Sequence, residues 1–126
     1  MSSIQVADET FVAAGSEAVG RAVGDRGNWR RWFPDLRLAV VEDRAGKGVR
    51  WTVAGPLTGT MEIWLEPVLD GVILHYFLHA EPTGAPTAQR ETAAMTHRRR
   101  VAGKRMAFEV KNDLEAGRPV GVAPTA

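Results

Sequence analysis

Residues 25–34 read DRGNWRRWFP and bring three large aromatic side chains into one short helical turn. Asn28 is the expected N-cap, and the proline that follows the aromatic residues ends the turn. Trp29, Trp32 and Phe33 lie at spacings i, i+3 and i+4, which places them on one face. A helix this short is not stable alone, so it must dock against an apolar surface. We call this segment the aromatic helix. It predicts a domain that forms a cavity, and we expect the helix to close one end of that cavity.

The composition is that of one globular domain. With 126 residues, 44% of them hydrophobic and 25% charged, the chain buries about two-thirds of its unfolded surface on folding. A net charge of +1 argues against a nucleic-acid binder, and the absence of cysteine excludes disulfides, thiolate nucleophiles and cysteine-ligated metals. The sequence shows no signal peptide and no stretch of membrane-spanning length. We therefore expect a single cytoplasmic domain over residues 1–126, without nucleic-acid partners or membrane insertion.

Strand and helix patterns surround the aromatic helix in a clear order. Before it, residues 3–13 predict a strand, and Ser16 is expected to cap a weak helix. After it, turn residues separate four strand segments, which predicts an antiparallel meander over 36–43, 48–55, 59–67 and 72–81. The remaining expectations are a loop over 82–90, a long helix over 92–116 that ends at Gly117 and Pro119, and a flexible tail over 119–126.

The turn at Asp70-Gly71 predicts the register of the last two strands, because a two-residue hairpin turn sets Leu69 opposite Val72. One face of the hairpin is then wholly apolar, and we expect it to point toward the long helix. The predicted pairs are Leu65 with Tyr76, Ile63 with Leu78 and Met61 with Ala80 on the inner face, and Glu62 with His79, Trp64 with Phe77 and Glu66 with His75 on the outer face.

The preceding hairpin and the long helix supply the rest of the core. The turn at Ala45-Gly46 aligns Leu38 and Val40 with Trp51 and Val53, and leaves open which side of the sheet Trp51 joins. The long helix carries a matching stripe of small and apolar side chains within about 140° of its circumference. Because one helix covers a curved sheet poorly, an apolar gap is expected between them. The stripe consists of Ala102, Gly103, Met106, Ala107, Val110 and Leu114.

This order of elements resembles the START-like, or SRPBCC, superfamily, which includes plant pathogenesis-related proteins, polyketide cyclase/dehydrases and lipid-transfer domains. The residues that carry the resemblance are Phe11-Val12-Ala13-Ala14, Val19-Gly20-Arg21-Ala22-Val23, the aromatic helix, and the closing segment 111–118. The resemblance implies an α+β helix-grip fold, in which a curved antiparallel sheet of five to seven strands wraps around a long C-terminal helix, with two short helices after the first strand. Either a further strand lies between residues 82 and 94, or the sheet is curtailed to five strands.

The resemblance further implies that a small hydrophobic or amphipathic molecule, such as a lipid, a polyketide or an aromatic compound, binds between sheet and helix. The sequence contains no cluster of side chains with metal-ligand spacing, so we expect no metal and no cofactor. Solid packing of the same side chains is the alternative. A buried Tyr76 needs a hydrogen-bond partner that a ligand can supply, and Arg99 is placed to pair with a ligand carboxylate or phosphate. The predicted ligand-binding residues are Trp32, Phe33, Trp51, Met61, Ile63, Leu65, Leu74, Tyr76, Leu78, Arg99, Met106 and Val110.

The outer hairpin face supports two further hypotheses. Its Glu and His pairs are suited to acid–base chemistry, as in a polyketide cyclase/dehydrase-like enzyme, but they are more typical of charge pairs on a solvated sheet. Because the predicted register places them outside the cavity, we expect a binding protein rather than an enzyme. Trp64 opposite Phe77 forms an exposed aromatic pair, which indicates either a homodimer through this face or a protein-interaction module.

A basic run, His97-Arg98-Arg99-Arg100 with Lys104 and Arg105, raises the question of a nucleic-acid or phosphate site. On a helix these charges point in several directions, and no aromatic platform or glycine-rich loop accompanies them. We therefore expect a solvated start of the long helix, with Arg99 as the exception that lies on the apolar stripe.

Overall fold

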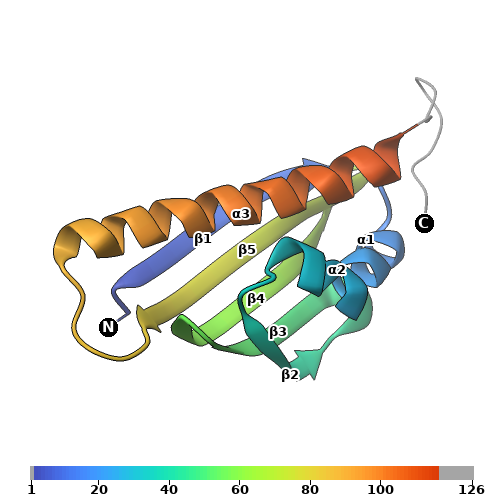
Figure 1. The fold of residues 1–126 in the computed structure, drawn as a ribbon. Coiled ribbons are helices and arrows are strands. Elements are labelled where there is room, and N and C mark those ends of the chain that lie inside the picture. Colours follow the sequence, from blue (N-terminus) through green and yellow to red (C-terminus); the bar gives the residue numbers. More distant parts are fainter. Residues whose placement is uncertain (1, 117–126) are drawn as a thin grey trace.

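A computed structural model describes residues 2–116, which form one five-stranded antiparallel sheet and the helices that pack on it (Figure 1). The strand order across the sheet is β1-β5-β4-β3-β2. The predicted fold class is confirmed: the fold is α+β, with a curved antiparallel sheet, a long C-terminal helix and two short helices after the first strand. The elements are β1 (Ile4–Val12), α1 (Ser16–Val23), α2 (Arg26–Trp32), β2 (Arg37–Asp43), η1 (Ala45–Lys47), β3 (Gly48–Ala54), β4 (Leu57–Val68), β5 (Gly71–Pro82) and α3 (Gln89–Glu115).

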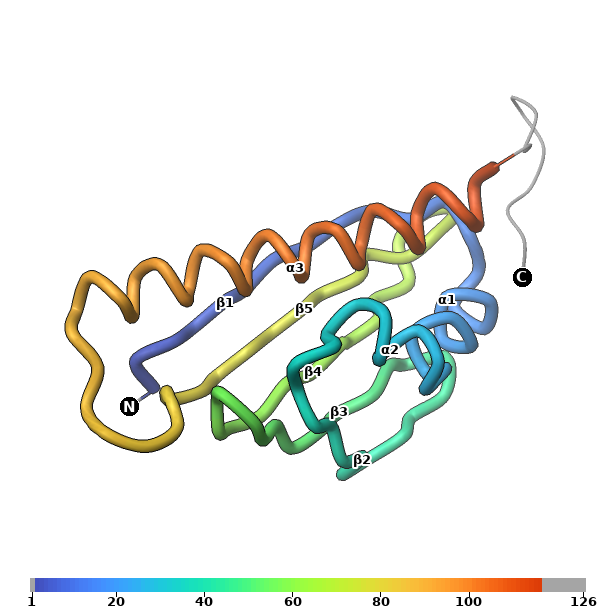
Figure 2. Tube along the Cα trace, viewed as in Figure 1, coloured from blue at the N-terminus to red at the C-terminus, as the bar shows by residue number. Residues whose placement is uncertain are grey.

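The helices divide the inner face of the sheet between them. α3 runs along β1 and β5, as the trace in Figure 2 shows, whereas α1 packs on β3 and β4. α2, which is the aromatic helix, contacts both α1 and α3. The apolar core therefore lies between the sheet on one side and all three helices on the other.

The β4–β5 hairpin has the predicted faces but not the predicted register. Its two turn residues are Leu69 and Asp70, one position earlier than expected. Leu69 has a φ of 54° and is 96% exposed, so it adopts a left-handed conformation that turn rules assign to Gly, Asn or Asp. Each predicted partner is wrong by two residues, and the period-two alternation of a strand keeps every side chain on its predicted face. The observed pairs are Leu65 with Leu74, Ile63 with Tyr76 and Met61 with Leu78 on the inner face, and Glu66 with Ile73, Trp64 with His75 and Glu62 with Phe77 on the outer face.

The other hairpin follows the prediction. Leu38 lies opposite Val53 and Val40 opposite Trp51. Trp51 is fully buried and lies opposite Met61 in the next strand, so it joins the inner face. This assigns the side of the sheet that the sequence left open.

Both predicted helix caps are wrong. Asp25 caps the aromatic helix, because its carboxylate accepts a hydrogen bond from the backbone N–H of Gly27, and Asn28 lies inside the helix. Gly15 precedes α1, so Ser16 is the first helical residue and makes no capping hydrogen bond. α2 begins at Arg26, two residues before the predicted cap Asn28. α1 begins at Ser16, the predicted cap itself.

Of the two alternatives left open by the sequence, the structure shows the sheet of five strands without a further strand after β5. β5 ends at Pro82 and α3 begins at Gln89, so no strand lies between them, and α3 starts before the predicted residue 92. The expected helix end at Gly117 and Pro119 and the expected tail over 119–126 lie outside the described residues.

α3 approaches the sheet closely at Gly103. A β-carbon built there would lie 2.5 Å from Cε2 of Tyr76, so only a glycine fits without displacement of the ring. The predicted stripe faces the core: four of its residues are buried and two are partly buried. The buried four are Gly103, Met106, Ala107 and Val110, and the other two are Ala102 and Leu114.

We expect Gly103→Val to lower the free energy of unfolding by about 2 kcal/mol, because the added side chain collides with the Tyr76 ring. Helix propensity alone favours valine over glycine and would act in the opposite direction. Ala94→Val, at an exposed position of the same helix, serves as the control and should cost less than about 1 kcal/mol. Urea unfolding followed by circular dichroism measures both, and equal stability of Gly103→Val and the wild type would contradict the close approach.

Candidate functional site

Two buried polar groups on the inner face have no hydrogen-bond partner among residues 2–116. They are the hydroxyl of Tyr76 and the indole N–H of Trp51, and both side chains are 0% exposed. An unpaired buried polar group costs about 1–3 kcal/mol, and native proteins pair nearly all of them. Each of the two groups is therefore a buried donor that the described residues leave unsatisfied.

Burial makes the Tyr76 phenol still harder to deprotonate than an exposed one. Removal of the phenol from water raises its pKa far above the usual value, and the positive charge of Arg99 acts in the opposite direction. The hydroxyl therefore keeps its proton at neutral pH and is a hydrogen-bond donor as well as an acceptor.

The aromatic helix packs against both of these rings. Phe33 stacks on Tyr76 with ring centroids 6.1 Å apart and planes inclined by 9°. Trp29 meets Trp51 edge-on at 5.1 Å, and its own indole N–H donates to the carbonyl of Val23. The helix thus packs directly on the two rings that carry the unpaired groups.

Trp32, the third aromatic residue of this segment, faces α3. Its indole N–H donates to the carboxylate of Glu109, which also forms an ion pair with Arg31. The hydrogen bond from Arg31, together with that from Trp32, lowers the pKa of Glu109. These polar contacts connect α2 to α3 at the rim of the core.

Arg99 and Asp35 form a second link between α3 and the segment that follows α2. Nη1 and Nη2 of Arg99 donate to the two carboxylate oxygens of Asp35 at 3.0 and 2.6 Å. These hydrogen bonds lower the pKa of Asp35. The Arg99 side chain is only 14% exposed, whereas that of Asp35 is 52% exposed. The sequence suggested Arg99 as a partner of a ligand anion, and in the structure a carboxylate of the chain itself takes that place.

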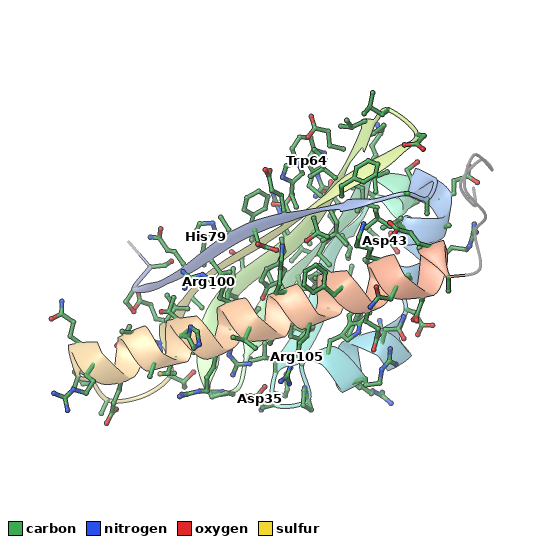
Figure 3. All side chains as sticks on the ribbon, turned by 90° about the horizontal axis from the view of Figure 1, so that it is seen from above. Asp35, Asp43, Trp64, His79, Arg100 and Arg105 are labelled. Carbon is green, nitrogen blue, oxygen red and sulfur yellow. The ribbon has the colours of Figure 1, made fainter. Side chains whose placement is uncertain are left out.

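A groove of about 310 Å³, the seam groove, lies between α2 and α3. Its floor includes the fully buried Met106, and its rim includes Arg105, which has no ion pair or hydrogen bond within the described part of the chain. Figure 3 shows Arg105 and Asp35 on one side of the molecule and Trp64 on the other. The volume lies at the lower end of the range for small-molecule pockets. The groove is lined by Arg31, Trp32, Pro34, Ala102, Arg105, Met106 and Glu109.

The structure brings the predicted ligand-binding residues together around one core. Ten of the twelve are buried, and Trp32 and Arg99 lie at its rim. The ten are Phe33, Trp51, Met61, Ile63, Leu65, Leu74, Tyr76, Leu78, Met106 and Val110.

The residues considered for acid–base chemistry lie on the outer face of the sheet. His75 Nε2 lies 2.9 Å from Glu66 Oε1, so this pair is present. Glu62 forms its ion pairs with Arg44 and Arg50, and His79 lies opposite Thr60. The enzyme hypothesis requires an acid or base inside the cavity, and the outward placement of these four side chains does not provide one.

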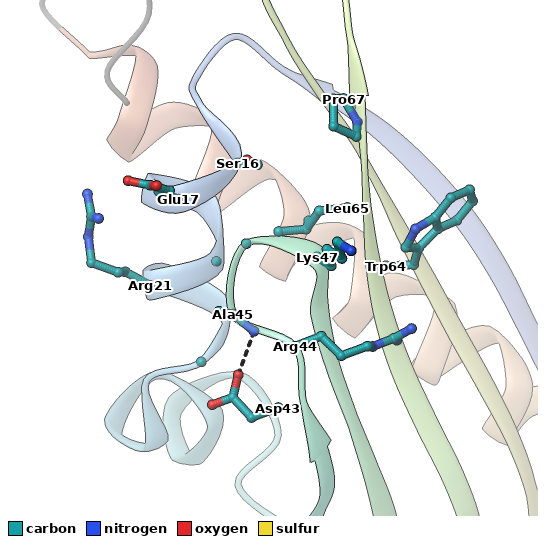
Figure 4. Close-up of a pocket in the computed structure, with 13 residues that line it drawn as sticks. Ser16, Glu17, Arg21, Asp43, Arg44, Ala45, Lys47, Trp64, Leu65 and Pro67 are labelled. Atoms are coloured by element: carbon teal, nitrogen blue, oxygen red, sulfur yellow. Dashed lines mark hydrogen bonds between the residues drawn. The ribbon is translucent and has the colours of Figure 1, made fainter.

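A larger groove of about 990 Å³ opens where α1, η1 and β4 meet (Figure 4). It combines charged side chains such as Arg21 and Lys47 with the apolar Trp64 and Leu65. Only Leu65 belongs to the predicted site. The lining residues come from three separate segments without a shared motif, so the sequence carried no signal for this groove.

The basic run does not form one surface. His97, Arg98 and Arg100 are exposed, whereas Lys104 lies 3.2 Å from the carboxylate of Asp8. Among residues 2–116, no three His, Cys, Asp or Glu side chains form a group that could hold a metal ion. Within the same range, no helix combines the length and the apolar character needed to cross a membrane.

Comparison by sequence finds no relative. No model of a protein family matches the chain, and no curated protein matches it at a significant level.

Solved structures match most of the described chain. The Aha1 dimer from Colwellia psychrerythraea superposes with a TM-score of 0.65 at 16% identity, over 92% of this chain and 99% of that chain. A Bacillus halodurans protein, BH1534, gives 0.63 at 13% identity, over 85% and 96%. The di-domain ARO/CYC protein StfQ from the steffimycin biosynthetic pathway gives 0.62 at 15% identity over 87% of this chain, which spans 49% of StfQ. At these identities the likeness concerns the fold alone: the chain has a helix-grip fold, in which a curved antiparallel sheet packs around a long C-terminal helix.

Proposed function

We propose that the protein binds a small hydrophobic or amphipathic molecule between the sheet and α3, with lipids, polyketides and aromatic compounds as candidate ligands. The observation that carries this proposal is the unpaired hydroxyl of Tyr76 in an apolar core. A ligand oxygen at this place would restore the missing hydrogen bond, and the surrounding side chains would bury the apolar body of the ligand. The indole N–H of Trp51 supplies a second donor on the same face.

The seam groove is the proposed entrance. Its floor is Met106, whose flexible side chain adapts easily to a new neighbour. The contacts that join α2 to α3 at this rim are ion pairs of partly exposed side chains, Arg31 with Glu109 and Arg99 with Asp35. An exposed pair such as Arg31 with Glu109 contributes only about 0–1 kcal/mol, so the stacking of Phe33 on Tyr76 and the hydrogen bond from Trp32 to Glu109 set most of the cost of opening this rim.

The variant Tyr76→Phe separates the two roles of the hydroxyl. In the free protein it removes an unpaired buried group, so we expect the free energy of unfolding to rise by about 1 kcal/mol. In the complex it removes a hydrogen bond to the ligand, so binding of the neutral fluorophore Nile red should weaken about tenfold. Urea unfolding and fluorescence titration measure the two effects.

Thr10→Val is the matched control, because it removes a buried hydroxyl that already pairs with Nζ of Lys104. We expect this variant to lose stability and to bind Nile red as the wild type does. Native mass spectrometry of protein purified without denaturation provides an independent test, in which a co-purified small molecule supports the proposal. A wild type that carries no such molecule and does not bind Nile red would overturn it.

A second surface supports association with another copy of the chain. On the outer face, His75 stacks between Trp64 and Phe77, with ring centroids 4.5 and 6.1 Å apart, and Trp64 remains 39% exposed. Glu9 on β1 and Arg50 on β3 lie toward opposite edges of this face, so a two-fold axis lying in the face and parallel to the strands would bring unlike charges together. We propose a homodimer through this face.

Analytical ultracentrifugation tests the homodimer. Trp64→Ser removes the central exposed ring and should raise the dimer dissociation constant at least thirtyfold, as expected for a buried aromatic side chain at an interface. Val101→Ser changes an apolar residue of α3 that is also 39% exposed, and should leave association unchanged. A wild type that sediments as a monomer at high concentration would contradict the dimer.

A further inference from the structure

Arg99 lies on the stretch of α3 that packs against Tyr76, whose hydroxyl is unpaired. It precedes Gly103 by one helical turn on the same face of α3, and the Tyr76 ring packs on the backbone at Gly103. The Arg99 side chain is mostly buried, and its positive charge is close enough to affect the phenol. A guanidinium and a hydroxyl therefore converge on one region at the edge of the core.

Both groups have donors to spare. Asp35 accepts one N–H from each terminal nitrogen of Arg99 and leaves three of the five guanidinium N–H groups without a partner within residues 2–116. The Tyr76 hydroxyl adds a further donor. A group of convergent donors around a cation is complementary to an acceptor that carries negative charge.

The charges around the seam groove also favour a negatively charged ligand. Arg31 is neutralised by Glu109 and Arg99 by Asp35. Arg105 on the groove rim has no counter-ion among the described residues, so the groove lining itself carries one positive charge in excess, and Asp25 and Asp113 lie close enough to Arg31 to offset part of it. Arg105 is exposed, so this excess draws an anion toward the groove only over the short range that salt screening allows.

We propose that the ligand is an amphipathic carboxylate, with its carboxylate between Arg99 and the Tyr76 hydroxyl and its apolar body in the core next to Phe33 and Met106. This inference rests on the proposed function, because it names the chemical class of the ligand for the same site. In the free protein the Asp35 carboxylate accepts two hydrogen bonds from the Arg99 guanidinium. It therefore competes with the ligand carboxylate for Arg99.

Three probes of equal chain length test the head group: decanoate, decanol and decylamine, each used to displace Nile red at neutral pH. We expect decanoate to bind the wild type at least tenfold more tightly than decanol, and decylamine to bind most weakly. Arg99→Gln should abolish the preference for decanoate and make the affinities for decanoate and decanol equal. Asp35→Asn should strengthen decanoate binding several-fold, because Arg99 then faces no competing carboxylate.

Arg100→Gln is the matched control, because it removes the same charge from the next residue of α3, where the side chain is exposed. It should preserve the preference for decanoate, and loss of the preference in this variant would assign the effect to overall charge and overturn the proposal. Equal binding of decanoate and decanol by the wild type would also overturn it, while the proposed ligand-binding function would stand. If Nile red and all three probes fail to bind, the proposed function falls and this inference falls with it.

Discussion

The contact between the Tyr76 ring and the backbone of α3 at Gly103 sets the geometry of this molecule. Because residue 103 has no side chain, the helix lies directly on the ring, and the ring holds the helix at a fixed height above β5. Phe33 stacks on the other part of the same ring and thereby ties the aromatic helix to the sheet. The phenol oxygen is carried into the core by this packing and finds no partner there. Tyr76 thus connects the sheet, the short helix α2 and the long helix α3. The same packing leaves its hydroxyl buried without a hydrogen-bond partner, and this group is the basis of the proposed function.

The faces of the sheet were predictable from the sequence, and the exact pairing was not. Alternation of apolar and polar residues along β4 and β5 assigns each side chain to a face, and this signal survives a register error of two residues. The error itself comes from Leu69, which adopts a left-handed turn conformation that its side chain disfavours. Packing of the strands on both sides of the turn outweighs this local preference. The cap at Asp25 was missed for a related reason, since both Asp25 and Asn28 are good caps and only the docked position of the helix selects between them.

The core part of the candidate site was predictable, and its rim was not. Apolar periodicity identified the inner-face residues and the stripe of α3, and the spacing from Met106 placed Arg99 on that stripe. Asp35, its partner, lies 64 positions away in the sequence, so only the folded chain brings the two together. The same holds for Trp32 with Glu109, and for the groove between α1, η1 and β4, whose residues share no motif. Contacts between distant segments are set by tertiary packing, for which a single sequence contains no direct signal.

The central claim is that a ligand occupies the space between sheet and helices, and the four tryptophans report on it individually. Trp29 and Trp32 donate their indole N–H groups to Val23 and Glu109, Trp51 is buried without a partner, and Trp64 is exposed on the outer face. The most direct measurement is the set of indole N–H signals in a nitrogen–proton correlation spectrum during titration with decanol. The account predicts a large shift of the Trp51 signal and an unchanged Trp64 signal. A shift of Trp64 with Trp51 unaffected would place the ligand outside the core and contradict the account.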